Sequence, residues 1–197
     1  MSNTTIAVAP FEDAVGTHHR FTSVRFQGVE WDLSHLRPFG KRIELELKTG
    51  AIFVDVVFFY SCHCFTRSFS DAVGLPQTPK AEIYSDGREI RRLDLERYSL
   101  SRAVLPGIVS GLEARQLKIA SGLPNFFTIE ITAVSGRTVN YAVFFEVERD
   151  KARKGRLLVR IQSAYPIEEL PKRMREAGKV KFATLLRAAY EGRTITG

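Results

Sequence analysis

Residues 125–166 read NFFTIEITAVSGRTVNYAVFFEVERDKARKGRLLVRIQSAYP and contain three hydrophobic runs separated by two polar turns. The runs cover residues 126–134, 139–147 and 156–165, and the turns lie at residues 135–137 and 150–155. Aromatic and β-branched residues dominate the runs, which is typical of β-strands. Because short turns join antiparallel neighbours, this stretch predicts a three-stranded antiparallel meander.

The strands before the meander are expected to pair as hairpins. Residues 42–48 alternate apolar and charged side chains, whereas residues 52–60 are apolar on both faces apart from one aspartate. These patterns predict a half-buried strand beside a central strand. Asp86-Gly87 predicts a second hairpin, because this dipeptide readily adopts the positive φ angles of a tight turn.

Two helices complete the expected fold. Residues 99–117 carry apolar residues near helical spacing, with Ser99 and Ser101 as candidate N-caps and a kink or break expected at Pro106. Residues 180–191 have one continuous apolar face. Helices and strands are partly segregated, and no β-α-β alternation is visible. We therefore expect an α+β fold: antiparallel sheets with a mid-chain helix and a C-terminal amphipathic helix packed on one face.

Length and composition are typical of an ordinary folded domain. The chain has 197 residues, of which 44% are hydrophobic and 26% are charged. We expect a flexible lead-in over residues 1–19 and one domain over residues 20–197. No basic start followed by an apolar run opens the chain, and no apolar run is long enough to span a bilayer. These features predict a cytoplasmic protein without a membrane partner.

Positive charge is concentrated in the last quarter of the chain. The whole chain carries a formal net charge of +7. Residues 151–197 contain 12 Lys or Arg but only 4 Glu, whereas basic and acidic residues nearly balance in the rest. This asymmetry favours a polyanionic partner, with nucleic acid the first candidate. The alternative is a solvated basic face that only keeps the protein soluble.

Six basic residues are candidate nucleic-acid ligands, because guanidinium and ammonium groups contact phosphates without reading sequence. They are Arg160, Lys172, Arg173, Arg175, Lys179 and Lys181.

The motif SCHCFTR at residues 61–67 follows the most apolar predicted strand. His63 can act as a general acid or base near neutral pH, and Arg67 can hold a phosphate. Asp55 lies on the same face of the strand and could orient the imidazole if a bulge or a partner strand brought it close. The alternative is a partly buried histidine whose polar atoms are satisfied between two small thiols.

A zinc site at this motif is not expected. Structural zinc sites need a full ligand set with wider spacing between cysteines than that of Cys62 and Cys64. Neighbouring residues of a strand also point to opposite faces. Other histidines could complete a set only through an accident of the fold. The sequence therefore predicts no metal and no cofactor, and the two thiols are expected to be free because a bridge would close a strained loop.

The motif RIQSAYP at residues 160–166 ends the meander. Alternation places Ser163 and Tyr165 on one face of the strand, with Arg160 and Gln162 on the other. If the face with the two hydroxyls is exposed, a phosphodiester could bind there beside basic residues. The alternative is that apolar residues earlier on the same face make Tyr165 part of the core.

Several enzyme signatures are missing from the sequence. It contains no glycine-rich phosphate loop, no G-x-S-x-G motif and no H-E-x-x-H motif. Most nucleotide hydrolases, serine hydrolases and zinc proteases of the H-E-x-x-H type are therefore disfavoured.

Three motifs resemble a group of uncharacterised bacterial and prophage-encoded proteins. They are CHCFTR at residues 62–67, NFFTIE at residues 125–130 and SAYP at residues 163–166. The similarity runs from about Trp31 to Ile195 and implies no established activity.

A second, looser resemblance concerns the hydrophobic strand that ends in SAYP and is followed by basic residues. It is similar to the closing strand of the barnase–EndoU–colicin–RelE group of metal-independent ribonucleases. The resemblance implies helices packed on an antiparallel sheet, with Ser163 and Tyr165 at the active face. It also implies Arg160 or Lys172 as phosphate clamps and His63 as an additional acid or base.

These observations lead to one functional expectation with two alternatives. We expect a nucleic-acid-directed protein of a bacterial mobile element that acts as a metal-independent ribonuclease-like toxin. RNA is expected as its partner in preference to DNA. Its catalytic residues would be His63, Arg67, Ser163 and Tyr165. The first alternative is a non-catalytic interaction protein that binds a nucleic acid or a protein partner. The second is a growth or stress accessory factor. The sequence leaves open whether the protein is an enzyme.

Overall fold

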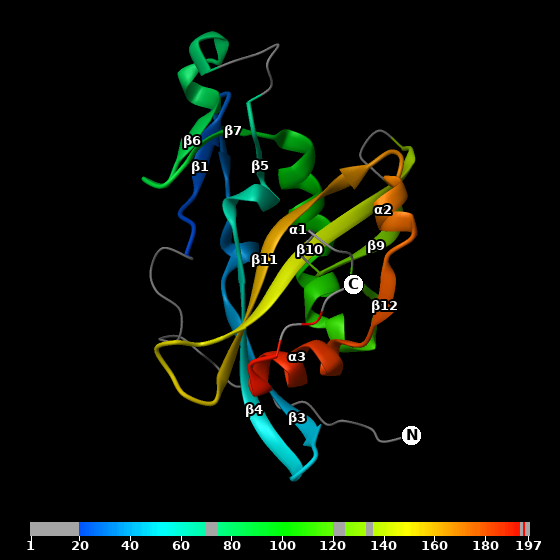
Figure 1. Cartoon of the computed structure of the whole chain (residues 1–197). Coiled ribbons are helices and arrows are strands. Elements are labelled where there is room, and N and C mark those ends of the chain that lie inside the picture. The colour runs from blue at the N-terminus through cyan, green and yellow to red at the C-terminus, as the bar shows by residue number, and fades with distance from the viewer. Residues whose placement is uncertain (1–19, 70–74, 120–124, 133–135, 194, 196–197) are drawn as a thin grey trace.

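The computed structural model describes residues 20–69, 75–119, 125–132, 136–193 and 195. The lead-in predicted over residues 1–19 lies outside these described residues. Within them the fold is α+β, as the sequence predicts, with three sheets and helices placed in mid-chain and near the C-terminus (Figure 1).

The largest sheet has seven strands in the order β12-β8-β9-β10-β11-β4-β3. The strands are β3 (Phe39–Leu47), β4 (Gly50–Tyr60), β8 (Leu117–Ile119), β9 (Asn125–Thr132), β10 (Thr138–Arg149), β11 (Arg156–Ile167) and β12 (Gly178–Val180). The predicted meander is confirmed as β9-β10-β11, and the predicted hairpin is confirmed as β3-β4. The last strand of the meander, β11, is longer than predicted. It continues through Pro166, which was expected to end it and instead pairs with Tyr141.

One strand pair departs from the antiparallel prediction. β4 and β11 are parallel neighbours, from Asp55 opposite Arg156 to Tyr60 opposite Ile161. β4 is apolar on both faces, which suits a strand covered on both sides. The carboxyl ends of parallel strands lie at the same edge of a sheet. The segment that follows Tyr60 therefore meets the second half of β11.

Two small sheets lie beyond this edge of the large sheet (Figure 1). They consist of β1 (Val24–Phe26) with β2 (Val29–Trp31), and of β5 (Thr66–Arg67), β7 (Ile90–Leu93) and β6 (Ile83–Ser85) in that order. The predicted turn at Asp86-Gly87 joins β6 to β7, and Gly87 has the positive φ of 82° that the turn requires.

The C-terminal helix lies close to its predicted range of residues 180–191, whereas the mid-chain helix begins and ends earlier than the predicted residues 99–117, and Leu117 begins a strand instead. They are α1 (Leu95–Ser110), α2 (Lys172–Arg175) and α3 (Phe182–Glu191), with short 3₁₀ segments η2 (Ser34–Leu36), η3 (Cys62–Cys64), η4 (Leu75–Gln77), η5 (Lys80–Glu82) and η6 (Leu112–Ala114). The predicted serine caps of α1 are wrong, because Asp94 caps the helix and accepts from the Arg97 amide at 2.9 Å. The predicted break is also wrong, since α1 continues through Pro106.

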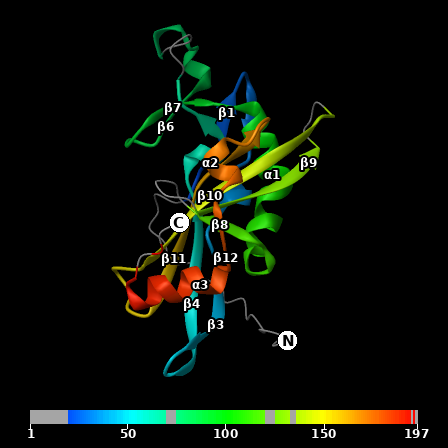
Figure 2. The ribbon, with the colours of Figure 1, turned by 45° about the vertical axis from the view of Figure 1, so that its right-hand side comes forward.

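Both longer helices pack on one face of the large sheet, as predicted. Buried residues of α1 and α3 belong to one cluster with the inward side chains of β4, β10 and β11. Figure 1 shows α1 behind β10 and β11, and Figure 2 shows α3 beside β3 and β4. A smaller cluster on the opposite face joins Met174 of α2 to Phe126, Ala142 and Phe144. The sheet thus has a thick core on one face and a thinly covered face on the other.

Candidate active site

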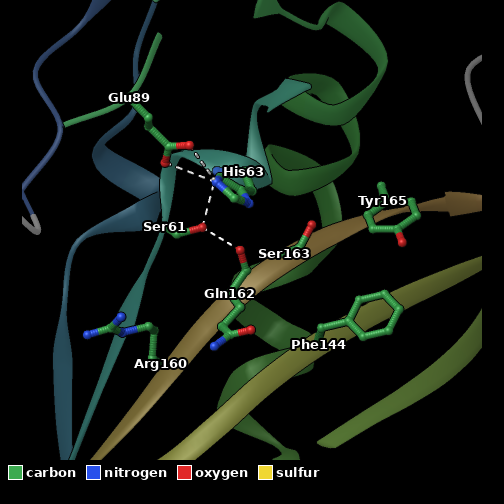
Figure 3. A pocket seen from close by; sticks show the side chains of 8 residues that line it. All are labelled: Ser61, His63, Glu89, Phe144, Arg160, Gln162, Ser163 and Tyr165. Atoms are coloured by element: carbon green, nitrogen blue, oxygen red, sulfur yellow. Dashed lines mark hydrogen bonds and ion pairs between the residues drawn. The ribbon is translucent and has the colours of Figure 1, made fainter. Parts of the chain in front are cut away.

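A cavity of about 570 Å³ opens on the thinly covered face of the sheet (Figure 3). Its lining residues are Ser61, His63, Glu89, Phe144, Arg160, Gln162, Ser163 and Tyr165. Two sequence motifs that lie about one hundred residues apart therefore meet in one place. Four residues predicted for the site line this cavity: His63, Arg160, Ser163 and Tyr165.

The two motifs meet because β4 and β11 run parallel. The strand pairing continues past the end of β4, where the Ser61 amide donates to the Ile161 carbonyl at 2.9 Å. The Ser61 hydroxyl also donates to the carbonyl of Gln162. These bonds hold the turn that carries His63 directly against the second half of β11.

A β-bulge decides which side chains of β11 face the cavity. Phe145 of β10 pairs with Ile161 and Phe144 pairs with Ser163, so Gln162 is an extra residue in β11. An extra residue reverses the alternation of side chains beyond it.

The bulge overturns the faces predicted by simple alternation. Ile161 and Ala164 are both completely buried, whereas Arg160, Ser163 and Tyr165 all line the cavity. Arg160 therefore shares a face with the two hydroxyls instead of opposing them. Tyr165 is not on the core face of the residues earlier in the strand; its partly buried ring packs against the smaller cluster that contains Phe126 and Phe144.

The SCHC segment is a short 3₁₀ helix and not the end of a strand. The Ser61 hydroxyl caps it by accepting from the His63 amide at 3.1 Å. The prediction that neighbouring side chains point to opposite faces of a strand therefore fails here. The turn places Cys62 and His63 on the same side, toward β7.

A carboxylate that the sequence analysis missed orients the imidazole. His63 Nε2 lies 3.0 Å from both Oε1 and Oε2 of Glu89, which precedes β7 (Figure 3). His63 is 34% exposed and Glu89 38% exposed, so solvent reaches both. Asp55, the predicted partner, instead pairs with Arg42 at 2.8 Å. The Asp-Gly turn indicated the hairpin that carries Glu89, but only tertiary packing brings that hairpin to His63.

Glu89 is held in its ionised form. Burial acts to raise its pKa, but hydrogen bonds from Cys62 and His63 and the charges of His63 and Arg91 outweigh burial, so the pKa lies below its usual value. An ionised carboxylate only accepts hydrogen bonds, so Nε2 of His63 is the donor. In the neutral ring Nδ1 then carries the free lone pair and can accept a proton.

The two cysteines are free and buried. Burial is the main reason why the pKa of each thiol lies above its usual value, and it raises that of Cys64 to about 12. A thiol with a raised pKa is a weak nucleophile at neutral pH. Thiolate attack by either cysteine is therefore disfavoured at this site.

Arg97 connects the two walls of the cavity. Its guanidinium donates to the carbonyls of His63 at 3.2 Å and of Thr66 at 2.8 Å. It also lies 4.5 Å from the centre of the Tyr165 ring, whose plane stacks on Phe144 at 5.5 Å. A hydrogen-bonded cation over an aromatic ring is a favourable contact. Arg97 thereby fixes Tyr165 relative to the turn that carries His63.

Arg160 is a cation placed between two cavities. Its guanidinium lies 5.4 Å from the centre of the Phe59 ring and 3.7 Å from Glu148. A second cavity, of about 130 Å³, shares Arg160, Ser61 and Glu89 with the first. Arg160 can therefore reach an anion in either space.

Arg67 lies outside the site. It is not among the residues that line either cavity, and its Nε lies 3.5 Å from Asp94. The 3₁₀ turn ends before Arg67 and directs this side chain into β5. Its predicted role at the same phosphate as His63 has no geometric support.

The remaining basic candidates do not line the cavity. Lys172, Arg173 and Arg175 are exposed on α2, whose Met174 packs beside Phe144, so they border the same face of the sheet. The last two, Lys179 on β12 and Lys181 at the start of α3, are also exposed. The cations of the C-terminal quarter are thus divided between the cavity, its border and the far edge of the sheet.

Comparison with known families gives the class of this α+β protein. The YjaZ family model matches residues 23–190, so the chain belongs to the YjaZ family. The match supports the predicted resemblance to an uncharacterised bacterial family, whereas the three motifs as its signature and the resemblance to ribonucleases stay predictions. No curated protein and no solved structure matches the chain. Among the described residues, no helix is long and apolar enough to cross a membrane.

Proposed function

We propose that this protein is a metal-independent ribonuclease that acts as a growth-arresting toxin of a bacterial mobile element. One observation carries the proposal: the His63–Glu89 pair faces Arg160, Ser163 and Tyr165 across a single cavity. A volume of about 570 Å³ is in the range of ordinary small-molecule sites and can receive one nucleotide of an RNA chain.

The proposed reaction uses the 2′-hydroxyl of RNA as the nucleophile. His63 Nδ1 takes the hydroxyl proton while Glu89 holds the other side of the ring. The 2′ oxygen forms a bond to phosphorus, and the bond from phosphorus to the 5′ oxygen breaks. The leaving oxygen receives a proton from the Tyr165 hydroxyl, which is then restored from solvent. The products are a 2′,3′-cyclic phosphate and a free 5′-hydroxyl.

Arg160 and Ser163 serve the phosphate in this proposal. The charge on the non-bridging oxygens increases in the transition state, and a fixed guanidinium beside a hydroxyl stabilises it. The contacts of Arg160 with Phe59 and Glu148 hold the guanidinium in place before RNA binds. DNA lacks the 2′-hydroxyl, so the same site binds DNA without cleaving it.

The direct test is RNA cleavage by purified protein in the presence of a chelator. Wild-type protein should produce fragments with 2′,3′-cyclic phosphate ends and should leave the matching DNA intact. His63→Ala should slow cleavage by about 10²- to 10⁴-fold, the usual contribution of a general base. Glu89→Gln, Arg160→Ala and Tyr165→Phe should each slow it as well.

Two variants serve as controls. Arg67→Ala removes a predicted residue that lies outside the cavity, and Tyr190→Phe removes a tyrosine hydroxyl beside a different cavity. Both should cleave RNA at the wild-type rate. Expression of the wild type should arrest growth, and His63→Ala should relieve the arrest. Intact RNA after incubation with folded wild-type protein would rule out the enzyme.

A non-catalytic nucleic-acid-binding protein is the second candidate. It is favoured by the exposed Lys172, Arg173 and Arg175 on α2, which packs on the same face of the sheet as the cavity. Such binding should weaken steeply as salt rises, because each phosphate contact releases a counterion. Arg173→Glu with Arg175→Glu should abolish it, whereas Lys151→Glu at the β10–β11 turn should change it little. Binding without cleavage would favour this candidate over the ribonuclease.

A further inference from the structure

Three ligand-type atoms converge beside the main cavity. Cys62 Sγ, His63 Nε2 and a carboxylate oxygen of Glu89 all lie within 4.8 Å of one another. Glu89 Oε1 contacts both of the other ligand atoms: it lies 3.1 Å from the Cys62 sulfur and 3.0 Å from His63 Nε2. Tetrahedral ligands bound at about 2.0 to 2.3 Å from one zinc ion lie roughly 3 to 4 Å apart. The separations to Glu89 Oε1 fit this spacing.

We propose that Cys62, His63 and Glu89 bind one Zn²⁺ ion, with its fourth position open to the cavity. A thiolate, an imidazole and a carboxylate together are typical zinc ligands, whereas magnesium and calcium prefer oxygen atoms alone. Three protein ligands with one open position are the usual arrangement of an accessible zinc site. The sequence prediction of no metal depended on the spacing of the two cysteines, on the lack of a full ligand set and on strand geometry. The 3₁₀ turn replaces the strand, and the proposed site uses one cysteine and the distant Glu89.

The surrounding residues support the carboxylate as a ligand. Arg91 Nη1 lies 3.2 Å from Glu89 Oε2 and leaves Oε1 directed toward the sulfur and the imidazole. Arg91 is itself buried and donates through Nε to the Thr66 hydroxyl at 2.7 Å. Thr66 in turn donates to the Cys62 carbonyl at 2.8 Å, which fixes the turn. Hydrogen bonds from outside the ligand set orient the carboxylates and imidazoles of many metal sites.

An ion can reach the three ligands from the cavities. His63 and Glu89 line the larger cavity, and Cys62 and Glu89 line the smaller one. The site therefore lies where the two spaces meet, and the buried sulfur faces the smaller of them. Zinc binding replaces the thiol proton of Cys62, which is released to solvent, because a coordinating sulfur is bound as the thiolate.

The zinc site uses two residues of the proposed ribonuclease but does not depend on that activity. A bound ion takes the lone pair of His63 Nε2 and takes Glu89 away from the ring. The single proton of the neutral ring then lies on Nδ1, which cannot accept another. The metal and the proposed proton transfer therefore exclude each other, which is why the cleavage assays above contain a chelator.

The test uses Co²⁺ as a spectroscopic substitute for Zn²⁺ on chelator-treated, full-length protein. One equivalent of Co²⁺ should produce sulfur-to-cobalt charge-transfer absorption and the visible bands of a four-coordinate ion. One equivalent of Zn²⁺ should abolish both signals. X-ray absorption of the wild-type zinc protein should report one sulfur among otherwise nitrogen and oxygen ligands. None of these readouts requires RNA cleavage, so failure here and failure of the ribonuclease are distinguishable.

The two neighbouring cysteines give a matched pair of variants. Cys62→Ser should lose the charge-transfer band, whereas Cys64→Ser, which alters a buried thiol outside the ligand set, should keep it. His63→Gln and Glu89→Gln should weaken Co²⁺ binding by more than the roughly 10- to 100-fold cost of losing an outer partner. If the wild-type protein shows no sulfur ligand by X-ray absorption, or if Cys64→Ser abolishes the band and Cys62→Ser does not, the proposal is wrong.

Discussion

The two halves of β11 both pair with β10 but have opposite roles. In the first half, Leu157, Val159 and Ile161 point into the core and are almost completely buried. In the second half, Ser163 and Tyr165 line the cavity and are only partly buried. Both halves pair with β10, but only the first half also pairs with β4, which ends at Tyr60. The difference in role therefore comes from the backbone between the halves together with the end of β4, where the turn that carries His63 takes its place.

A single extra residue separates the two roles. Gln162 forms the bulge, and the Ser61 hydroxyl binds its carbonyl. Bulges next to functional sites commonly redirect side chains in this way. The same strand can then supply core residues at one end and a row of polar side chains at the other, without a loop between them.

The largest expected effect is a difference in the free energy of unfolding between substitutions in the two halves of β11. Ile161→Ala should lower the free energy of unfolding by about 2 to 5 kcal/mol, because it leaves a hole in a closely packed core. Ser163→Ala should lower it by less than about 0.5 kcal/mol, because its side chain lines an open cavity. Urea denaturation of both variants measures the difference. Equal losses would mean that the two halves are packed alike.

A smaller effect is expected at Tyr165, where the ring and the hydroxyl have separate roles. Tyr165→Ala should cost about 1 to 3 kcal/mol of stability, because it removes the stack on Phe144 and the contact with Arg97. Tyr165→Phe keeps both ring contacts and should be nearly as stable as the wild type, yet it should cleave RNA more slowly. Thermal unfolding and the cleavage assay together test this separation; a stable, fully active Tyr165→Phe would remove the hydroxyl from the mechanism.

The bulge itself can be tested at Ser61. Ser61→Ala removes the donor to Gln162 and the acceptor for the His63 amide, and it should cost about 1 to 2 kcal/mol. Ser61→Thr retains the hydroxyl and should recover most of this loss. Amide hydrogen exchange should show faster exchange of the Ile161–Ser163 segment in Ser61→Ala. Unchanged exchange would show that strand pairing alone holds the bulge.

The smallest effect concerns acid. The pKa of Glu89 lies below its ordinary value of 4.5 in the folded protein, so the unfolded chain binds this proton more readily. Its stabilising contribution is present above pH 4.5 and is lost as the pH falls through the folded pKa. The stability of Glu89→Gln should therefore decline less than that of the wild type below pH 4.5.

A separate acid effect is expected at His35, and it acts as an internal control. Burial lowers the pKa of His35 below its ordinary 6.5, so its stabilising contribution is present above pH 6.5 and is lost as the pH falls through the folded pKa. This loss begins at a higher pH than that of Glu89, whose ordinary pKa is 4.5. His35 lies on η2 and contacts α1, with its Nε2 3.0 Å from the Ser101 hydroxyl. Urea denaturation of His35→Gln and Glu89→Gln across pH 3 to 8 should resolve two distinct windows. A single shared window would mean that the two groups are coupled.

Much of the fold follows from local patterns. Strict alternation over residues 42–48 predicts β3, and the Asp-Gly turn predicts the β6–β7 hairpin, because each depends only on neighbours in the chain. The candidate site was partly predictable for the same reason: His63 and Tyr165 are chemically suited residues near the ends of apolar strands. Glu89 was not predictable, because nothing near it in the sequence indicates which segment its hairpin will contact.

By itself, the sequence determined the meander, the α+β class and the residue types available for chemistry, because periodicity and turn residues act over a few positions. Only the tertiary structure decided that β4 and β11 run parallel and that Gln162 bulges. Strand pairing between distant segments depends on which sheet edges are free and which faces need cover, and that balance is set by the whole core. This long-range choice brings His63 to Glu89 and places Tyr165 on the other wall of the cavity.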